Sequence, residues 1–203
     1  MNTIAYIIKN NLYLNITNSC SNDCTFCIRQ KPHAFNDEFE LWLDHEPSEV
    51  EILTSIKQPE TFDEIVFCGY GEPLTRLAMV KSVAKYLKNK GCMIRVDTNG
   101  TSNLIHKKNI VPELVGLVDT VSISLNAHNA ELYSELCCPK FGIKTFEEVL
   151  KFARLCKKLL PRTQLTVVEF PKVDIPACQK IADDIGVTLK IRRYYEEDYA
   201  GFK

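Results

Sequence analysis

Strand-like and helix-like patterns alternate along this chain of 203 residues, and the alternation limits the folds open to it. Six short runs rich in β-branched and aromatic residues have the composition of strands: residues 12–17, 64–68, 93–98, 120–125, 164–170 and 188–194. Amphipathic helical patterns separate most of them: residues 46–57, 74–91, 145–160 and 175–186. Parallel strands need long crossovers, which are right-handed and usually helical, so this order predicts an α/β fold with a parallel sheet.

The length of the chain narrows the choice between an open sheet and a barrel. A Rossmann-like open sheet and a barrel both satisfy the alternation, but six units are too few for a full eight-stranded barrel of about 250 residues. They suit an incomplete (β/α)6 TIM-like barrel of parallel strands, with residues 1–203 forming one domain. In either architecture ligands bind at the carboxyl ends of the strands.

The composition argues against nucleic-acid and membrane binding. The formal net charge is -1, no long basic run is present, and no apolar stretch reaches the roughly 20 residues that a membrane span needs. The amino-terminal stretch lacks the basic and apolar regions of a secretory signal. These features predict a cytoplasmic protein whose partners are small molecules or other proteins.

Nine cysteines are the most informative residues for chemistry. An odd number in a chain without an export signal argues against a disulfide framework and favours metal or redox chemistry. Three of them, Cys20, Cys24 and Cys27, fall within eight positions directly after the first predicted strand. The others are scattered, and we expect buried, inert thiols there: Cys68, Cys92, Cys137, Cys138, Cys156 and Cys178.

Three clustered thiols leave two kinds of metal site open. Structural zinc sites and ordinary iron–sulfur sites are closed by four protein ligands, so Cys68 or a histidine would have to complete such a site. A cluster of four irons and four sulfides held by three thiolates instead keeps one iron open for a chelating molecule. Cys137 and Cys138 could supply an auxiliary ligand or a hydrogen-atom donor, but too few cysteines follow them to complete a second cluster.

Polar and glycine-containing stretches follow the other predicted strands. Residues 69–73 (GYGEP) come after the second strand, and residues 98–100 (TNG) end the third. The fourth strand carries Ser122, Ser124 and Asn126 at alternate positions, which predicts that all three point to one face, the barrel interior. We therefore expect these stretches to share one rim of the sheet with the three cysteines.

The cysteine spacing resembles a known family signature. Cys-x3-Cys-x2-Cys after an early strand, with Phe26 before the last cysteine, is similar to the motif of the radical S-adenosylmethionine (SAM) superfamily. Residues 70–73 (YGEP) resemble that family's GGEP stretch, with Tyr70 in place of the first glycine. Together with TNG, VSISLNA and CPKFG, these motifs are similar over most of the chain to the small TatD-associated radical SAM subfamily.

The resemblance implies two cofactors and an activity. Cys20, Cys24 and Cys27 would hold a 4Fe-4S cluster, and the amino and carboxyl groups of SAM would chelate its open iron. Reductive cleavage of SAM would give methionine and a 5′-deoxyadenosyl radical, which abstracts hydrogen from a substrate at the barrel mouth. A flavodoxin-type or ferredoxin-type protein would donate the electron.

The resemblance also implies contacts with SAM for other residues. Phe26 would lie near the adenine, and Gly71 and Glu72, flanked in the motif by Tyr70 and Pro73, would meet the ammonium group. Five polar residues at strand ends would face the ribose and the carboxylate: Thr98, Asn99, Ser122, Ser124 and Asn126. Three others could reach the adenine or the substrate: Asn15, Arg192 and Tyr194.

Three functions stay open at the level of the sequence. The first is an enzyme that acts on a small or nucleotide-derived molecule. The second is an activase or modifying enzyme whose substrate is a partner protein, because the open side of an incomplete barrel can admit a protein loop. The third is a non-catalytic iron–sulfur or zinc protein. No residue is predicted to carry out the chemistry on the substrate.

Overall fold

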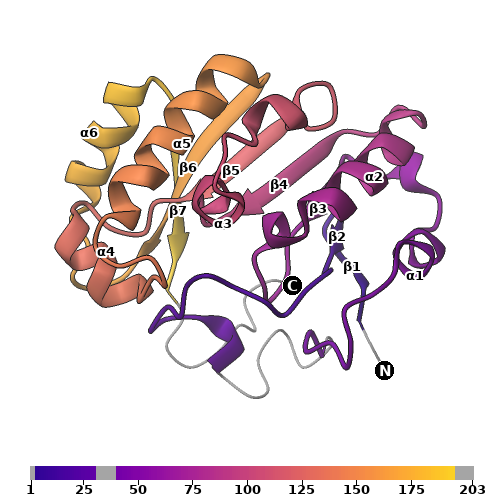
Figure 1. Cartoon of the computed structure of the whole chain (residues 1–203), viewed down its shortest axis with the longest axis horizontal. Helices are drawn as coiled ribbons and strands as arrows, with labels where there is room; N and C mark the ends of the chain where they lie inside the picture. Colours follow the sequence, from indigo (N-terminus) through magenta and orange to yellow (C-terminus); the bar gives the residue numbers. More distant parts are fainter. Residues whose placement is uncertain (1–2, 31–39, 195–203) are drawn as a thin grey trace.

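Seven strands form one sheet whose order follows the chain (Figure 1). The computed structural model describes residues 3–30 and 40–194. The strands are β1 (Ala5–Ile8), β2 (Asn11–Leu14), β3 (Glu64–Phe67), β4 (Ile94–Thr98), β5 (Thr120–Ser124), β6 (Arg162–Glu169) and β7 (Thr188–Arg193). Strands β2 to β7 run parallel to one another. The predicted α/β fold, with a mostly parallel sheet consistent with an incomplete barrel, is confirmed.

The strand β1 is absent from the sequence prediction. It pairs antiparallel with β2, with Ala5 opposite Leu14 and Ile8 opposite Asn11. The tight turn between the two strands places Lys9 at φ 55, in the left-handed region that non-glycine residues adopt uncommonly. No glycine or proline marks this turn, which Lys9 and Asn10 form, so the sequence gives only a weak sign of a hairpin.

Six α-helices and four short 3₁₀ turns connect the described strands. The helices are α1 (Glu49–Ser55), α2 (Leu77–Lys88), α3 (Ser102–His106), α4 (Ala130–Cys137), α5 (Thr145–Leu159) and α6 (Ile175–Ile185). The 3₁₀ turns are η1 (Ile28–Gln30), η2 (Pro59–Thr61), η3 (Pro73–Arg76) and η4 (Val111–Leu114). Helices α1, α2, α5 and α6 coincide with the predicted segments. Helices α3 and α4 were not predicted, because each is too short to show a clear period in the sequence.

The two faces of the sheet differ in character. The helices cover one face of the sheet, here called the outer face (Figure 1). On this face, alternate strand residues such as Ile65, Ile123 and Leu165 are fully buried in one apolar core. The face that turns away from the helices, here called the inner face, carries the intervening residues, such as Arg95 and Gln164. Their alternation follows from the two-residue period of a strand.

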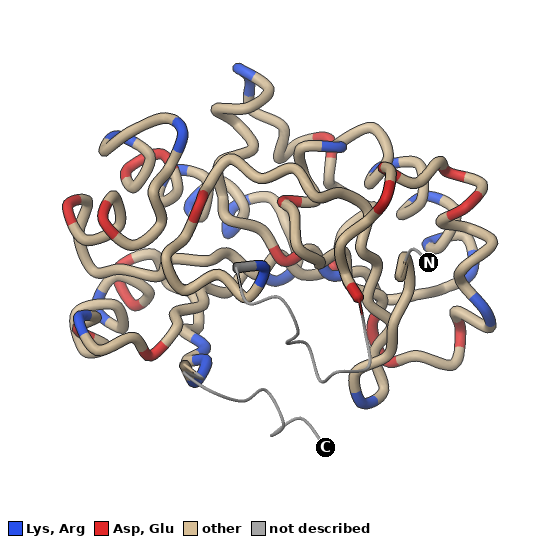
Figure 2. Tube along the Cα trace, turned by 90° about the horizontal axis from the view of Figure 1, so that it is seen from below, with Lys and Arg blue, Asp and Glu red and all other residues tan. Residues whose placement is uncertain are grey.

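Parallel strands bring their carboxyl ends to one edge of the sheet, and the predicted functional loops gather there. Residues 18–27 follow β2, residues 68–73 follow β3 and residues 99–101 follow β4. Lys and Arg are interspersed with Asp and Glu along the trace (Figure 2), in keeping with the small net charge. No helix within residues 3–30 and 40–194 is long and apolar enough to cross a bilayer.

Candidate active site

The cysteine loop, residues 18–27, is held by the carboxyl end of helix α4. The backbone N–H of Asp23 donates to the carbonyl of Cys137 at 3.1 Å, and that of Thr25 donates to the carbonyl of Leu136 at 2.8 Å. The side-chain Nδ2 of Asn22 also donates to the Tyr133 hydroxyl, at 3.0 Å. These bonds tie the loop after the first parallel strand to a helix more than one hundred residues later in the chain.

None of the three cysteines of this loop forms a disulfide, and all three are partly exposed. Burial raises the pKa of the Cys20 thiol to about 11 and also raises that of Cys27. Cys24 shares a side-chain hydrogen bond with Cys137, and this bond together with burial raises the pKa of Cys24. Within the part of the chain that the structure describes, no three sulfur, imidazole or carboxylate groups converge closely enough to hold a metal ion. Joint metal binding by the three thiols would therefore require them to move closer together.

The turn after β3, residues 69–73, lies directly against the cysteine loop. A Cβ atom at Gly71 would lie 2.3 Å from the Thr17 carbonyl oxygen and 2.7 Å from that of Ser19, so only glycine fits. The N–H of Glu72 donates to the same Ser19 carbonyl at 2.8 Å. Tyr70 instead packs in a small cluster with Tyr6 and Leu41, and Pro73 begins the 3₁₀ turn η3. In this stretch the glycine and the glutamate are therefore the residues closest to the cysteine loop.

Glu72 joins two of the loops at the rim. Its carboxylate is buried and accepts hydrogen bonds from the Leu74 N–H at 3.0 Å, the Thr98 hydroxyl at 2.8 Å and the Asn99 N–H at 2.6 Å. Burial raises the pKa of Glu72 to about 7, although these three donors act in the opposite direction. Oxygen Oε2 accepts from Asn99 alone among the described residues, so it retains capacity for one more donor.

The TNG turn after β4 connects Glu72 to the cysteine loop. Asn99 donates through Nδ2 to the Ser21 hydroxyl at 2.9 Å and to the Cys20 sulfur at 3.7 Å. The hydroxyls of Ser21 and Thr101 lie 2.7 Å apart, and both groups are buried. Thr98 and Asn99 therefore hold the rim together in this structure. Ser21 and Thr101, which take part in the same contacts, carry no motif that singles them out in the sequence.

The three predicted residues of the fourth parallel strand do not all follow the strand's alternation. Ser122 lies within β5, and its hydroxyl accepts a hydrogen bond from the side-chain amide Nε2 of Gln164 at 3.1 Å. Strand β5 ends at Ser124, and Asn126 has φ 56, so the two-residue period stops before Asn126. The alternation of β5 therefore does not determine the face to which Asn126 points, and the shared face of the three residues stays a prediction. Asn126 is nevertheless buried, and its side-chain Oδ1 has no hydrogen-bond donor among the described residues.

Aromatic contacts link the cysteine loop to the last strands. The ring of Phe26 lies 5.9 Å from that of Phe170, which follows β6, and Phe170 lies 5.0 Å from Tyr194, which follows β7. Arg192 is exposed near the carboxyl end of β7. Residues predicted from opposite ends of the chain therefore approach one rim, where Phe26 and Phe170 are aromatic neighbours.

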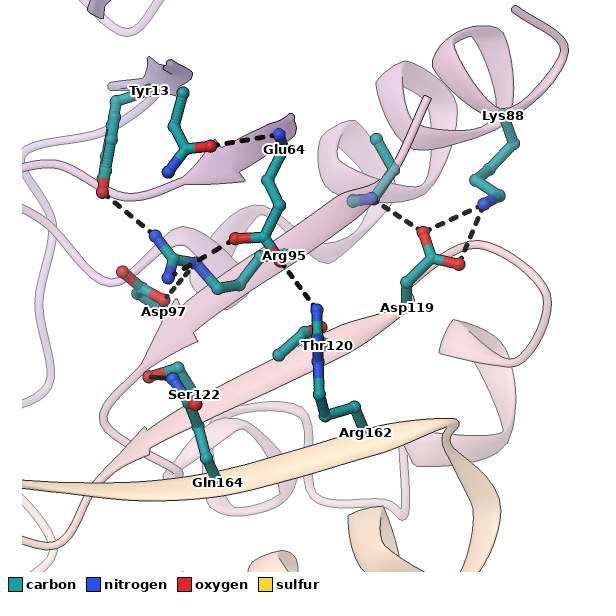
Figure 3. Close-up of polar contacts among 12 residues, drawn as sticks. Tyr13, Glu64, Lys88, Arg95, Asp97, Asp119, Thr120, Ser122, Arg162 and Gln164 are labelled. Carbon is teal, nitrogen blue, oxygen red and sulfur yellow. Dashed lines mark hydrogen bonds and ion pairs between the residues drawn. The ribbon is translucent and has the colours of Figure 1, made fainter. Parts of the chain in front are cut away.

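The inner face carries a charged network that the sequence analysis did not identify (Figure 3). Arg95 donates to the Tyr13 hydroxyl at 3.0 Å and forms ion pairs with Asp97 at 3.3 Å and Glu64 at 3.6 Å. Arg162 binds the other oxygen of Glu64 at 2.9 Å. The alternation of Arg95 and Asp97 within residues 93–98 was a usable signal, because a strand packed on apolar layers at both faces would carry apolar residues there.

The described residues fit a 4Fe-4S cluster and SAM in their donor chemistry. Three thiols share one loop, and Gly71 lets a neighbouring turn approach it without a side chain in between. Glu72 and Asn126 each offer a buried oxygen able to accept a further hydrogen bond. When bound, the two groups would supply an electron and a carbon-centred radical to the site.

Comparison with known families is consistent with these features. The sequence profile of the Radical SAM superfamily matches residues 14–185, which include the cysteine loop and strands β3 to β6. The match covers most of the chain. The chain therefore belongs to the radical SAM superfamily, and it is an enzyme of that superfamily.

Two curated relatives come from Methanocaldococcus jannaschii. One, MJ1227, is named as a glycyl-radical enzyme activating enzyme and is 31% identical over 130 residues, which are 63% of this chain and 50% of that protein. The other is named as a probable GTP 3′,8-cyclase and is 27% identical over 198 residues, which are 94% of this chain and 61% of that protein. The chain thus spans one half to about three fifths of the length of these relatives.

Solved structures show the same fold at low sequence identity. SuiB from Streptococcus suis superposes with a TM-score of 0.62 at 14% identity, over 91% of this chain and 39% of that one. Methylornithine synthase (PylB) superposes with a TM-score of 0.58 at 14% identity, over 97% of this chain and 57% of that one. Both matches support the fold described above.

Proposed function

We propose that this radical SAM enzyme binds a 4Fe-4S cluster through Cys20, Cys24 and Cys27 and uses SAM to abstract hydrogen from a small or nucleotide-derived molecule. One observation carries the proposal. The three thiols lie on a loop that contacts the Gly71–Glu72 turn and is bonded to the Asn99 turn, all at the carboxyl edge of the sheet. In parallel α/β folds this edge is where ligands bind.

The residues around the loop have separate tasks in this proposal. The ionised Glu72 carboxylate accepts the ammonium group of SAM through the free capacity of Oε2, while its other bonds fix the distance between the two turns. Thr98 and Asn99 keep that carboxylate in place. Phe26 presents an apolar surface for the adenine, and Ser122, Ser124 and Asn126 offer polar groups to the ribose and carboxylate of SAM.

The proposal assigns the second substrate only by class. The relative named as a GTP cyclase supports a nucleotide-derived molecule, and the relative named as an activating enzyme supports the alternative, a partner protein. A pull-down from host extract separates these two possibilities, because only the alternative requires a stable protein partner. Reductive SAM cleavage by the isolated protein separates both from a non-catalytic iron–sulfur or zinc protein.

Three further assignments belong to the same proposal. We expect a flavodoxin-type or ferredoxin-type protein to reduce the cluster, because radical SAM enzymes need a low-potential donor. We also expect the enzyme to act in the cytoplasm. The closer similarity to the TatD-associated subfamily rests on the sequence motifs alone, including CPKFG beside the cysteine loop.

Iron and sulfide analysis tests the ligand assignment. Anaerobically reconstituted wild type should hold about four irons and four sulfides per chain, and Cys20→Ala, Cys24→Ala or Cys27→Ala should each lose most of them. Cys92→Ala is the matched control, because Cys92 is buried in the helix-side core. Stoichiometric zinc without sulfide would refute the proposal.

Cys137 provides a sharper test of the same ligand set. Its thiol contacts Cys24 in this structure, yet the proposal places Cys137 and Cys138 outside the cluster. Cys137→Ser should therefore retain the iron content of the wild type. Loss of iron in this variant, at unchanged secondary structure, would show that the ligand set is misassigned.

A further inference from the structure

Two cations of strand β7 lie on the inner face. In the register of β6 and β7, Leu165 pairs with Leu189, and both pack into the helix-side core. The intervening residues Lys190 and Arg192 pair with Thr166 and Val168 and therefore point to the opposite face. Arg193, the next residue along β7, points to the helix side like Leu189.

These two cations differ from the other basic residues of the inner face. Arg95 and Arg162 are bound by the carboxylates of Glu64 and Asp97. Lys190 and Arg192, in contrast, form no ion pair or side-chain hydrogen bond with any residue that the structure describes. Their positive charge reaches across the inner face, where it lowers the pKa of Asp97 against the larger effect of burial.

The balance of charge on this face is positive. Strands β3 to β7 present four cationic side chains there and two carboxylates: Arg95, Arg162, Lys190 and Arg192, against Glu64 and Asp97. Both carboxylates already have arginine partners. The charge that remains is that of the two β7 residues.

A buried acceptor without a donor belongs to the segment that follows β5, and this segment is bonded to β6. The N–H groups of Leu125 and Asn126 both donate to the Thr166 carbonyl, and Thr166 is the register partner of Lys190. The Asn126 side chain is buried, and its Oδ1 finds no donor among residues 3–30 and 40–194. The acceptor that the proposed function assigns to SAM and the two unpaired cations therefore belong to neighbouring segments, so a second substrate held by the cations would lie near SAM.

We propose that Lys190 and Arg192 bind a multiply charged anionic group, phosphate or polycarboxylate, and that the second substrate is an anionic small molecule. This inference rests on the proposed function and narrows its substrate class. Residues two apart on a strand are separated by about 6.6 Å along it, so the two cations can flank one compact polyanion. An acidic protein segment is less favoured, because the cations lie on the inner face of the sheet and not on an outward helix.

Titration with simple anions tests the proposal without the true substrate. Anaerobic, cluster-loaded wild type, Lys190→Gln, Arg192→Gln and Arg193→Gln are titrated with inorganic pyrophosphate and separately with citrate by isothermal calorimetry. A hydrogen bond between charged groups contributes about 1.5 to 3 kcal/mol, so each inner-face variant should raise the pyrophosphate or citrate Kd by roughly 10-fold to 100-fold. Arg193→Gln should leave both Kd values unchanged, since it removes the same charge from the opposite face.

The outcomes separate a phosphorylated substrate from a polycarboxylate, and they separate both from an acidic protein segment. Tighter binding of pyrophosphate supports a phosphorylated substrate, and tighter binding of citrate supports a polycarboxylate. Equal losses in Arg193→Gln, no binding of either anion by the wild type, or tighter binding of a poly-glutamate peptide would overturn the proposal. A SAM Kd that rises in Arg192→Gln as much as the pyrophosphate Kd would assign the arginine to SAM instead. Failure of the wild type to cleave SAM would refute the proposed function while leaving the anion titration interpretable.

Discussion

The outer and inner faces of the sheet are held in different ways. On the outer face, Ile65, Ile123 and Leu165 are fully buried in one apolar core, and burial of apolar area is enough to fix the strands against the helices. On the inner face, the same strands carry Glu64, Arg95 and other polar groups that lose hydration when the sheet forms. The packing of the outer face thus specifies the fold. The inner face carries polar residues where a sheet buried on both sides would carry apolar ones, and such departures are often found at functional surfaces.

The inner face is itself divided along the strands. Toward the amino ends, Arg95, Arg162 and Glu64 satisfy one another in the network of Figure 3. Toward the carboxyl ends, Arg192 and the Asn126 amide oxygen have no such partners among the described residues. The paired groups near the amino ends of the strands, here called the floor, hold one another in place. The unpaired groups at the rim remain for ligands.

Removing the central cation of the floor should have the largest effect on stability. Arg95→Met removes the arginine that pairs with Asp97 and Tyr13 and leaves Glu64 with Arg162 alone. Breaking a buried ion pair from one side costs about 3 to 5 kcal/mol, because the remaining charge is poorly solvated. Urea unfolding of the metal-free protein at pH 7 measures this change in the free energy of unfolding.

A double variant and an outer-face variant sharpen the comparison. Arg95→Met combined with Asp97→Asn should recover part of the loss, because the stranded charge is removed as well. Ile65→Ala, on the outer face of β3, should cost about 2 to 5 kcal/mol through lost packing, with little dependence on pH or salt. If Arg95→Met costs under about 1 kcal/mol, the floor of the inner face is solvated and the two faces differ less than described.

The sequence predicted the parallel strands well because their composition is set by the core. Six of the seven described strands lie at predicted positions, since each alternates or clusters β-branched residues that the helices cover. Strand β1 was missed because its turn at Lys9 uses no glycine or proline. Helix α4 was missed because eight residues with one Asn129 cap give a weak periodic signal.

The residues of the candidate site could be predicted from the sequence only where the site requires one particular residue type. Cysteine spacing and a glycine forced by close approach, as at Gly71, leave a signature in the chain. The bonds of Ser21 to Asn99 and of Asp23 to Cys137 join residues about eighty or more positions apart, so no local pattern reveals them. For the same reason, the pairing of Arg95 with Glu64 needed the strand register.

Substitution of Glu72 should have an effect of intermediate size, and the quantity affected is the affinity for SAM. If its carboxylate accepts the SAM ammonium, Glu72→Gln weakens SAM binding by roughly 10-fold to 100-fold, because a charge-assisted bond contributes about 1.5 to 3 kcal/mol. The variant also places an amide where the Asn99 N–H donates, so local loosening of the two turns is a competing explanation. Anaerobic SAM titration at equal cluster content measures the affinity.

The pH dependence distinguishes the two explanations. Burial raises the pKa of Glu72 to about 7, so the wild type should bind SAM more tightly as pH rises from 6 to 8 and the carboxylate ionises. In the ligand-free protein the raised pKa has the opposite consequence for folding. The protonated Glu72 contributes fully to the free energy of unfolding below the ordinary pKa of 4.5, and this contribution is lost as pH rises through about 7. Glu72→Gln should abolish both trends. An SAM affinity that is independent of pH in the wild type would contradict the ammonium contact.

The smallest effect is expected at the exposed end of the inner-face network. Arg162 binds Glu64 at 2.9 Å and the Thr120 hydroxyl at 2.8 Å, but its side chain is 59% exposed, so water and salt screen the pair. Exposed ion pairs contribute about 0.2 to 1 kcal/mol, and Arg162→Gln should lower the free energy of unfolding by no more than that. Glu64 keeps Arg95 as a partner in this variant, which limits the cost further. Urea unfolding at low and high salt measures the difference, which should shrink as salt is added. A loss of unfolding free energy comparable to that of Arg95→Met would mean that the floor is one cooperative unit that includes the exposed Arg162. The boundary between paired and unpaired polar groups of the inner face would then lie closer to β7.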